Sequence, residues 1–111
     1  MFAAELWKMH AMEEAKPKVE IEHEEADGRG AFFVARQGVR LAEMTYSRTG
    51  PDHVIIDHTE VHDALRGLGV ARRLLDTAVA WARETKTKVS ATCPYAHAQF
   101  EKDPSIRDVL A

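Results

Sequence analysis

The segment Arg66-Gly-Leu-Gly-Val-Ala-Arg72 places two closely spaced glycines directly before a helical pattern. Such glycines let the backbone turn tightly and present several N–H groups to one point. The first turn of a helix adds unpaired N–H groups and a partial positive charge, which favour an anion. Arg66, Arg72 and Arg73 crowd the same place, where the helix dipole disfavours each cation by roughly 0.3–1 kcal/mol unless an anion binds. The segment predicts a phosphate-binding loop; the alternative is a flexible turn with solvated arginines.

Two other kinds of phosphate-binding loop do not fit this sequence. A P-loop needs Gly-Lys followed by Ser or Thr, and the chain has no such tripeptide. A dinucleotide fingerprint needs a third glycine, where this chain has Arg72. It also needs an acidic residue about twenty residues further on, at the end of the next strand, and Lys88 to Cys93 supplies none.

The glycine segment resembles the Gln/Arg-x-x-Gly-x-Gly/Ala signature of the GNAT acetyltransferase superfamily. Together with His58-Thr-Glu-Val61, Cys93-Pro-Tyr-Ala96 and Phe100-Glu-Lys102, it resembles the very short branch of that superfamily, from about Lys18 to the end of the chain. The resemblance implies acetyl-CoA as the donor, with its pantetheine arm between splayed fourth and fifth strands, and an amine as the acceptor. It implies acetyl-CoA contacts from Arg66, Gly67, Leu68, Gly69, Val70, Ala71 and Arg72.

Acetyl transfer to an amine needs a neutral nucleophile, because a lysine amine has a pKa near ~10.4 and is protonated at neutral pH. His58 and Glu60 are candidates for the base, or for the start of a water path to one. They are two residues apart on the expected fourth strand, so they would share a sheet face. The alternative is that His58 is a packed strand histidine and Glu60 a solvated strand end.

Cys93 ends the expected fifth strand, beside the position that the resemblance implies for the thioester. Its thiolate could attack the thioester to give an acetyl-cysteine, or its thiol could protonate the departing CoA thiolate. A lone cysteine is also commonly a small buried hydrophobe. Direct attack by the amine is favoured over the covalent route.

The helix after the fifth strand departs from the family pattern. Many members carry a tyrosine there that protonates the thiolate, whereas this chain has Phe100, which has no hydroxyl. Cys93, Tyr95, His97 or water must then supply the proton. Phe100 and Lys102 are expected beside CoA, Lys102 at a CoA phosphate. The alternatives are core and cap roles for Phe100 and Tyr95, and a solvated lysine.

The acceptor site is expected to be open. Larger relatives have helices between the first two strands that wall it, and here only Ala26 to Gly30 joins them. This suits a protein lysine, a protein N-terminus or a small amine. A run of glutamates could attract a cationic acceptor, although a solvated strand face is the simpler interpretation; it comprises Glu20, Glu22, Glu24 and Glu25. The rival hypotheses are a non-catalytic CoA-binding sensor or interaction module and a thiol-transfer role for Cys93.

A metal site is not predicted. His58-Thr-Glu60 followed by Cys93 lacks the second cysteine of the zinc deaminases. His58 and His62 would share a metal only on a helix, and the sequence predicts a strand there.

Hydrophobic periodicity predicts the elements that position these residues. Apolar and acidic residues alternate from Lys18 to Glu24, as on a strand with one solvated face. Asp27-Gly28 and Gln37-Gly38 predict tight turns around a second strand, Ala31 to Ala35. A change of phase between Leu41 and Met44 predicts a bulge in the third strand. Gly50-Pro51-Asp52 ends that strand, and Val54-Ile55-Ile56 is apolar enough to begin a fourth strand buried on both faces.

One long amphipathic helix follows the fourth strand. Its shared apolar face consists of Ala71, Leu74, Leu75, Ala78, Trp81 and Ala82. Lys88 to Cys93 is the expected fifth strand, parallel to the fourth after a right-handed crossover. Ala96 to Lys102 predicts a short helix, and Asp103-Pro104-Ser105 starts another. The fold class is α+β, with a mixed, mostly antiparallel sheet. The resemblance adds a V-shaped splay between strands four and five and no helices between strands one and two.

Composition and charge limit the remaining classes. With 111 residues the chain has room for one domain, expected over residues 18–111 after an extension, 1–17, that is either a helix or a frayed tail. A formal charge of -3 argues against nucleic-acid binding, and no apolar run approaches the roughly 18 residues of a membrane span. No secretory signal is evident and the single cysteine suits a reducing compartment, so the cytoplasm is the expected location. The oligomeric state is left open.

Overall fold

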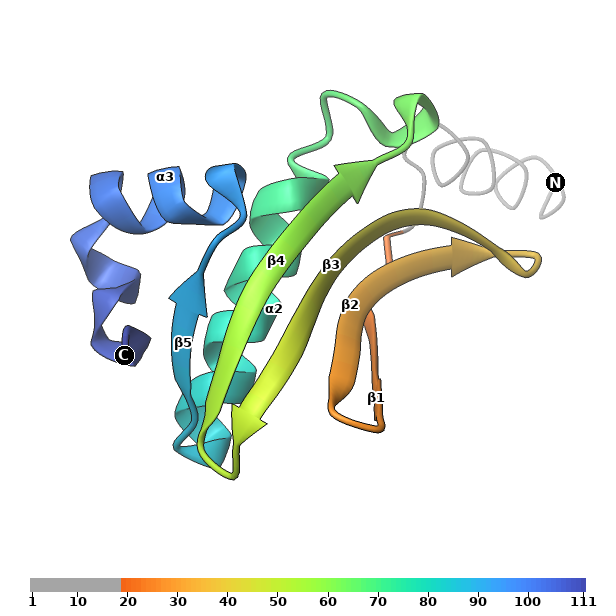
Figure 1. Cartoon of the computed structure of the whole chain (residues 1–111). Helices are drawn as coiled ribbons and strands as arrows, with labels where there is room; N and C mark the ends of the chain where they lie inside the picture. Colours follow the sequence, from red (N-terminus) through yellow and green to blue (C-terminus); the bar gives the residue numbers. More distant parts are fainter. Residues whose placement is uncertain (1–18) are drawn as a thin grey trace, which may run out of the picture.

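The computed structural model describes residues 19–111, and the expected extension, residues 1–17, lies outside them. Five strands form one sheet in the order β1-β2-β3-β4-β5, with the helix α2 along one face and the helix α3 beside β5 (Figure 1). Neighbouring strands are antiparallel except β4 and β5, which are parallel. The predicted α+β class and the mixed, mostly antiparallel sheet are confirmed. The elements are β1 (Glu22–Ala26), β2 (Arg29–Arg36), β3 (Val39–Gly50), β4 (His53–Val61), η1 (Asp63–Leu65), α2 (Val70–Thr85), β5 (Lys88–Ala91), α3 (Pro94–Lys102) and η2 (Pro104–Val109).

Two predicted hairpin turns are confirmed. Asp27 and Gly28 have φ values of 55° and 78°, and Gln37 and Gly38 have values of 51° and 81°. Both residues of each turn are therefore left-handed, as a two-residue turn of type I′ requires. Only this short turn joins β1 to β2, so the structure has no helices between its first two strands.

The sheet contains one predicted bulge and two that the sequence did not reveal. In β3, Arg40 lies opposite Ala35 and Ala42 opposite Val34, so Leu41 is an extra residue at the predicted place. Further register shifts leave Thr49 in β3 and Asp57 in β4 without an opposite residue. Bulges bend a strand and increase its twist, and β2 and β3 curve strongly (Figure 1).

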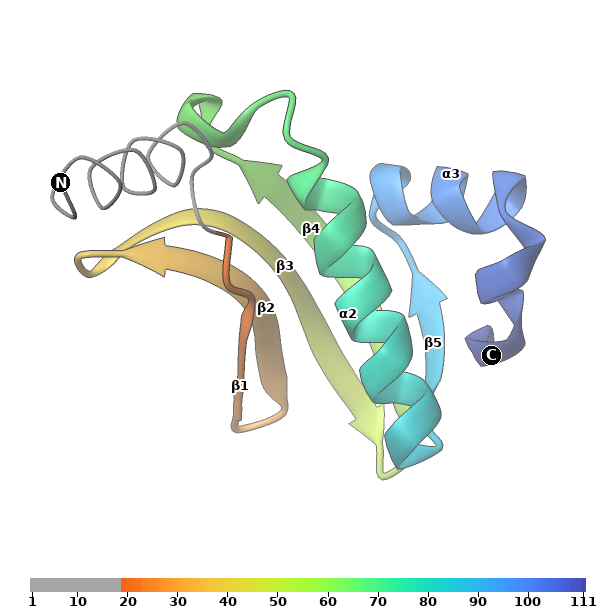
Figure 2. The same ribbon diagram turned by 180° about the vertical axis from the view of Figure 1, so that it is seen from behind.

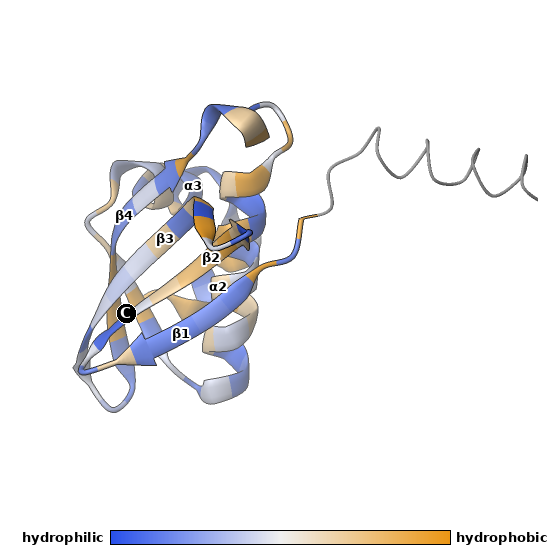
Figure 3. Cartoon of the chain, turned by 90° about the vertical axis from the view of Figure 1, so that its right-hand side faces the viewer, coloured by the Kyte–Doolittle hydropathy of each residue, from blue (hydrophilic) through white to orange (hydrophobic). Residues whose placement is uncertain are grey.

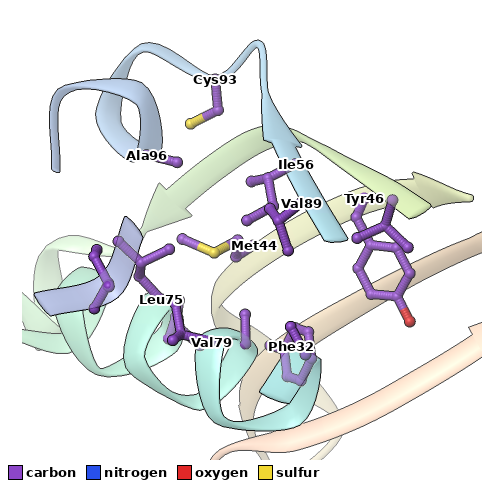
Figure 4. Close-up of a cluster of buried hydrophobic side chains, with 14 of the residues drawn as sticks. Phe32, Met44, Tyr46, Ile56, Leu75, Val79, Val89, Cys93 and Ala96 are labelled. Atoms are coloured by element: carbon purple, nitrogen blue, oxygen red, sulfur yellow. The ribbon is translucent and has the colours of Figure 1, made fainter. Parts of the chain in front are cut away.

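The core lies between the sheet and α2, which crosses the back of the sheet (Figure 2). The buried residues of α2 are Val70, Leu74, Leu75, Ala78, Val79 and Ala82. The predicted apolar face is confirmed except at Ala71 and Trp81, which are only partly buried at its margins. This face packs against side chains from the strands, with Phe32, Met44 and Ile56 among them (Figure 4).

Only one face of β4 is fully buried, because within residues 19–111 neither α2 nor α3 covers the opposite face of the central strands (Figures 1 and 2). Val54 and Ile56 are buried, whereas Ile55 between them is half-exposed. The expectation that this strand is buried on both faces is therefore wrong. Within residues 19–111, no helix is long and apolar enough to cross a membrane.

The strand β1 is a hydrophilic edge of the sheet (Figure 3). All five of its residues are exposed, but His23 stacks on Phe32 with ring centroids 4.2 Å apart. The Nε2 atom of His23 lies 2.7 Å from the Tyr46 hydroxyl, which donates to Glu25 at 2.6 Å. The Arg48 guanidinium also donates to Glu25, at 2.6 Å from Nε. These contacts attach β1 to the rest of the sheet.

The Glu25 cluster predicts a loss of stability in acid. Hydrogen bonds from Arg48 and Tyr46 hold the pKa of Glu25 at about 2, below its ordinary 4.5. A lowered folded-state pKa adds stability that is fully present above about pH 4.5 and is lost as the pH falls towards about 2. Because the pair lies at the surface, screening leaves about 1 kcal/mol. We expect the urea midpoint of Glu25→Gln to fall less steeply than that of the wild type over this range. Glu22→Gln is the control, and equal slopes in all three proteins would contradict the prediction.

Candidate active site

The glycine segment forms the loop between η1 and α2, as predicted. Gly67 and Gly69 have positive φ values of 82° and 69°, and Gly69 is the N-cap of α2. No side chain caps this helix. The Arg73 N–H donates to the Gly69 carbonyl at 3.1 Å, so the three preceding N–H groups have no acceptor within the helix. These donors converge where the sequence predicts an anion.

A cavity of about 260 Å³ opens at this helix start. It brings together six of the seven residues of the glycine segment, while Leu68 is exposed at the loop and outside the lining. Tyr95, at the start of α3, lines the same cavity, and Val61 and Leu65 add apolar wall. We call this space the loop cavity. It is lined by Val61, Leu65, Arg66, Gly67, Gly69, Val70, Ala71, Arg72 and Tyr95.

The arginines do not all face the loop as the sequence suggested. The Arg66 guanidinium is exposed and lies 2.7 Å from Asp63. The Arg73 guanidinium donates to the carbonyl of Val19 at 3.4 Å. The Arg72 guanidinium is occupied by partners on α2 and α3, which leaves its backbone N–H for an anion. The helix start, with its free N–H groups, therefore remains the feature of the cavity best placed to bind an anion.

The strands β4 and β5 separate just beyond their paired residues. Their pairing ends at Ile56 and Ala91. The N–H groups of Thr92 and Cys93 then both donate to the Ile56 carbonyl, at 3.0 and 3.1 Å. The strand β5 thus ends at Ala91 and not at Cys93 as predicted, because a ladder cannot continue when two donors share one acceptor. The resulting opening between β4 and the start of α3 is the predicted V-shaped splay (Figure 1).

Cys93 is buried at this opening and is the N-cap of α3. Its Sγ atom lies 3.2 Å from the Thr59 hydroxyl oxygen, and the side chain belongs to the core cluster with Ile56 and Ala96 (Figure 4). It is not among the residues of the loop cavity. A role for Cys93 as nucleophile or acid stays a prediction, and its packing is that of a small buried hydrophobe.

His58 and Glu60 share one sheet face, as predicted. The Nε2 atom of His58 lies 3.2 Å from a Glu60 carboxylate oxygen, and the two side chains are 55% and 71% exposed. Thr59 lies opposite the buried Met44, so its two neighbours point to the other face, away from α2. The alternative of a packed histidine does not describe His58. The pair can accept or relay a proton from a molecule that approaches from solvent.

Phe100 and Lys102, the last two residues predicted to contact CoA, do not line the loop cavity. Phe100 is 3% exposed in the core and borders a different cavity of about 390 Å³ near Arg107 and Leu110. Lys102 is exposed at the last residue of α3. The core role considered for Phe100 describes its position. Any contact of Lys102 with a CoA phosphate stays a prediction.

The acidic run of β1 is largely paired within the chain. Glu24 forms an ion pair with Arg40, and Glu25 forms one with Arg48. This leaves less free negative charge for a cationic acceptor than the sequence suggested. Within residues 19–111, no group of three or more His, Cys, Asp or Glu residues is placed to hold a metal.

The model of the GCN5-related N-acetyl-transferase family matches residues 31–109, which include the loop cavity, the splay and α3. The chain belongs to this family. The NATD1 protein of Mus musculus is 33% identical over 95 residues, which cover 85% of this chain and 84% of that protein. The NATD1 protein of Xenopus tropicalis is 32% identical over 87 residues, 78% of each chain.

Solved structures of the GCN5-related family share the fold. A GCN5-like protein from Staphylococcus aureus has 33% sequence identity and a TM-score of 0.64, over 86% of this chain and 91% of that one. A GNAT family acetyltransferase from Elizabethkingia anophelis, solved with acetyl-CoA bound, has a TM-score of 0.57. It is 11% identical and matches over 78% of this chain and 73% of its own. That neighbour supports the fold, and its ligand is acetyl-CoA.

Proposed function

We propose that the chain is an acetyl-CoA-dependent N-acetyltransferase that binds the donor pyrophosphate in the loop cavity. The observation that carries the proposal is the convergence of the glycine segment, an uncapped helix start and Tyr95 on one cavity of about 260 Å³. Uncapped N–H groups and the helix dipole together bind phosphate oxygens well. Family membership supports acetyl-CoA as the source of that phosphate.

The splay offers a place for the thioester arm of the donor. Beyond Ile56 and Ala91 the two strands no longer pair, so the backbone groups of β4 on that side are open to the amides of a pantetheine chain. The apolar side chains of Val61 and Leu65 continue the wall of the loop cavity beside β4. A donor held at the loop would thus reach the splay along β4.

The reaction forms a C–N bond between amine and acetyl carbon and breaks the C–S bond of the thioester. The amine gives up a proton, and the departing CoA thiolate takes one. We place Tyr95 as the donor of that proton, because it is the second residue of α3, next to the opening at Cys93, and also lines the loop cavity. Burial raises the pKa of its phenol, so the hydroxyl stays protonated at neutral pH. We place the exposed pair His58 and Glu60 on the proton path from the amine, through water.

The acceptor is proposed to be an amine that approaches from solvent. The two-residue turn between β1 and β2 leaves that side of the sheet without an added wall. A protein lysine, a protein N-terminus or a small amine fits such an open face. The exposure of His58 and Glu60 supports an acceptor that is not enclosed by the protein.

Calorimetry with CoA and acetyl-CoA tests the donor site, and thiol release with a panel of amines tests transfer. The panel contains lysine peptides, peptides with free N-termini and small amines. We expect a CoA dissociation constant within about 1 μM–1 mM, the usual range of KM values, and thiol release with at least one acceptor class. Absence of CoA binding would contradict the proposal. Binding without thiol release across the panel would favour the sensor or interaction module.

A further inference from the structure

The guanidinium of Arg72 is held by three partners within the chain, although it belongs to the glycine segment. Its Nε atom donates to Asp76 at 2.8 Å, its Nη1 atom donates to Gln99 at 2.8 Å, and its Nη2 atom donates to Asp103. Each of the three nitrogens donates one hydrogen bond, which uses three of the five N–H groups, and two of the partners lie at the end of α3. A guanidinium held in this way cannot reorient towards a phosphate without breaking these contacts.

The partners of Arg72 are themselves fixed. Asp103 is the C-cap of α3 and the N-cap of η2, and it accepts from the N–H and the hydroxyl of Ser105 at 2.9 and 2.6 Å. The hydrogen bond from the Ser105 hydroxyl, then that from Arg72 and that from the Ser105 N–H, hold the pKa of Asp103 at about 2. Its carboxylate is therefore charged throughout the neutral range. The contact ties the first turn of α2 to the last turn of α3.

The hydrogen bond from Arg72 to Gln99 also determines which face of α3 borders the loop cavity. Gln99 follows Tyr95 by four residues, so the two side chains lie on one side of the helix. Fixing Gln99 therefore fixes the rotation of α3 that aims Tyr95 at the cavity. The charge of Arg72 also reaches the phenol, where it lowers the pKa of Tyr95 against the rise that burial causes.

We propose that Arg72 is a positioning residue, which fastens α3 to α2 and so holds Tyr95 in the loop cavity, and that its guanidinium does not bind the CoA phosphates. That this placement of Tyr95 serves catalysis rests on the proposed function. The positioning itself depends only on the contacts of Arg72. Arginine suits this role because its planar fork serves three acceptors at once, which a lysine ammonium cannot do in the same geometry.

Four variants of the full chain test the proposal: Arg72→Gln, Arg72→Lys, Asp103→Asn and the control Arg83→Gln. Arg83 is a matched control, because it also joins α2 to the C-terminal segment, through Asp108 and the Ser105 carbonyl. The measurements are amide hydrogen exchange in α3, the pKa of Tyr95 from ¹³C NMR of labelled tyrosine, and the CoA dissociation constant. The chain has two tyrosines, and Tyr46→Phe assigns the signals.

In Arg72→Gln we expect α3 amides to exchange at least about tenfold faster, the Tyr95 pKa to rise, and CoA affinity to stay within about threefold, less than 1 kcal/mol. Arg72→Lys should restore the pKa but not the slow exchange. Asp103→Asn should speed exchange without tightening CoA binding, and Arg83→Gln should leave Tyr95 unchanged.

Two results would overturn the proposal. One is unchanged α3 exchange and an unchanged Tyr95 pKa in Arg72→Gln. The other is CoA binding weakened about tenfold or more in Arg72→Gln and tightened in Asp103→Asn, which would identify Arg72 as a phosphate ligand. Failure of the wild type to bind CoA would contradict the proposed function alone, since exchange and the Tyr95 pKa would still decide the positioning role.

Discussion

Replacement of Gly69 by aspartate is expected to abolish CoA binding, with affinity reduced at least about 100-fold, or roughly 2.7 kcal/mol. The new carboxylate would stand at the N-cap of α2, where the donor pyrophosphate is proposed to bind, and would repel it. The carboxylate would also compete with the pyrophosphate for the positive end of the helix dipole. A Cβ atom at Gly69 meets nothing within 4 Å, so the loss would come from charge and competition and not from a steric clash.

Gly38→Asp is the matched control for this change. Gly38 also has a positive φ, 81°, and open space around its Cβ position, but it lies in the turn between β2 and β3. The backbone strain and the added charge are therefore the same in the two variants. Calorimetry should show wild-type affinity for CoA in Gly38→Asp. Wild-type affinity in Gly69→Asp would show that the pyrophosphate binds elsewhere.

Tyr95→Phe is expected to lower kcat about 100-fold or more while CoA affinity stays within about threefold, because loss of a positioned acid typically costs 10²–10⁴ in rate. Phenylalanine keeps the ring that lines the loop cavity and removes only the hydroxyl. Burial keeps the phenol protonated at neutral pH by raising its pKa, so the lost group is one that can donate. Single-turnover thiol release, measured beside CoA calorimetry, separates the chemical step from binding.

Cys93→Ala tests whether the Tyr95 phenol or the Cys93 thiol takes part in the transfer. We expect it to reduce turnover less than about tenfold, through packing at the splay, because Cys93 is buried against Thr59 and the core. If Cys93→Ala abolished turnover and Tyr95→Phe did not, the proton or the acetyl group would pass through the cysteine. An acetylated Cys93 peptide in mass spectrometry would establish the covalent route.

The features that local sequence determines could be predicted. Asp27-Gly28 and Gln37-Gly38 form the expected turns because their left-handed conformations depend on the residues themselves. The glycine segment lies at the start of α2 because strand, loop and helix follow one another along the chain. The parallel pairing of β5 with β4 follows from the crossover through α2.

The features that depend on distant residues could not be predicted. Asp103 lies 31 positions from Arg72, so the engagement of that guanidinium had no sequence signal beyond the spacing of Arg72 and Asp76. The exposure of Ile55 depends on which sheet face lacks a helix, a property of the whole fold. Phe100 was expected beside CoA from its place in a motif, yet the packing of α3 turns it into the core.

The extra residue Asp57 determines which side chains of β4 beyond Ile56 point inward and which point to solvent. Ile56 lies opposite Tyr46 and points inward, and Thr59, three residues later, lies opposite the equally buried Met44. Side chains alternate along a strand, so if β4 continued from Ile56 without a bulge, the inward positions would be 58 and 60. A regular ladder through the same residues, with no bulge at Asp57, would therefore turn His58 and Glu60 towards the apolar interior and Thr59 away from Cys93. The chemistry proposed for the solvent side thus depends on the two residues that separate Ile56 from Thr59, where a regular strand would have one.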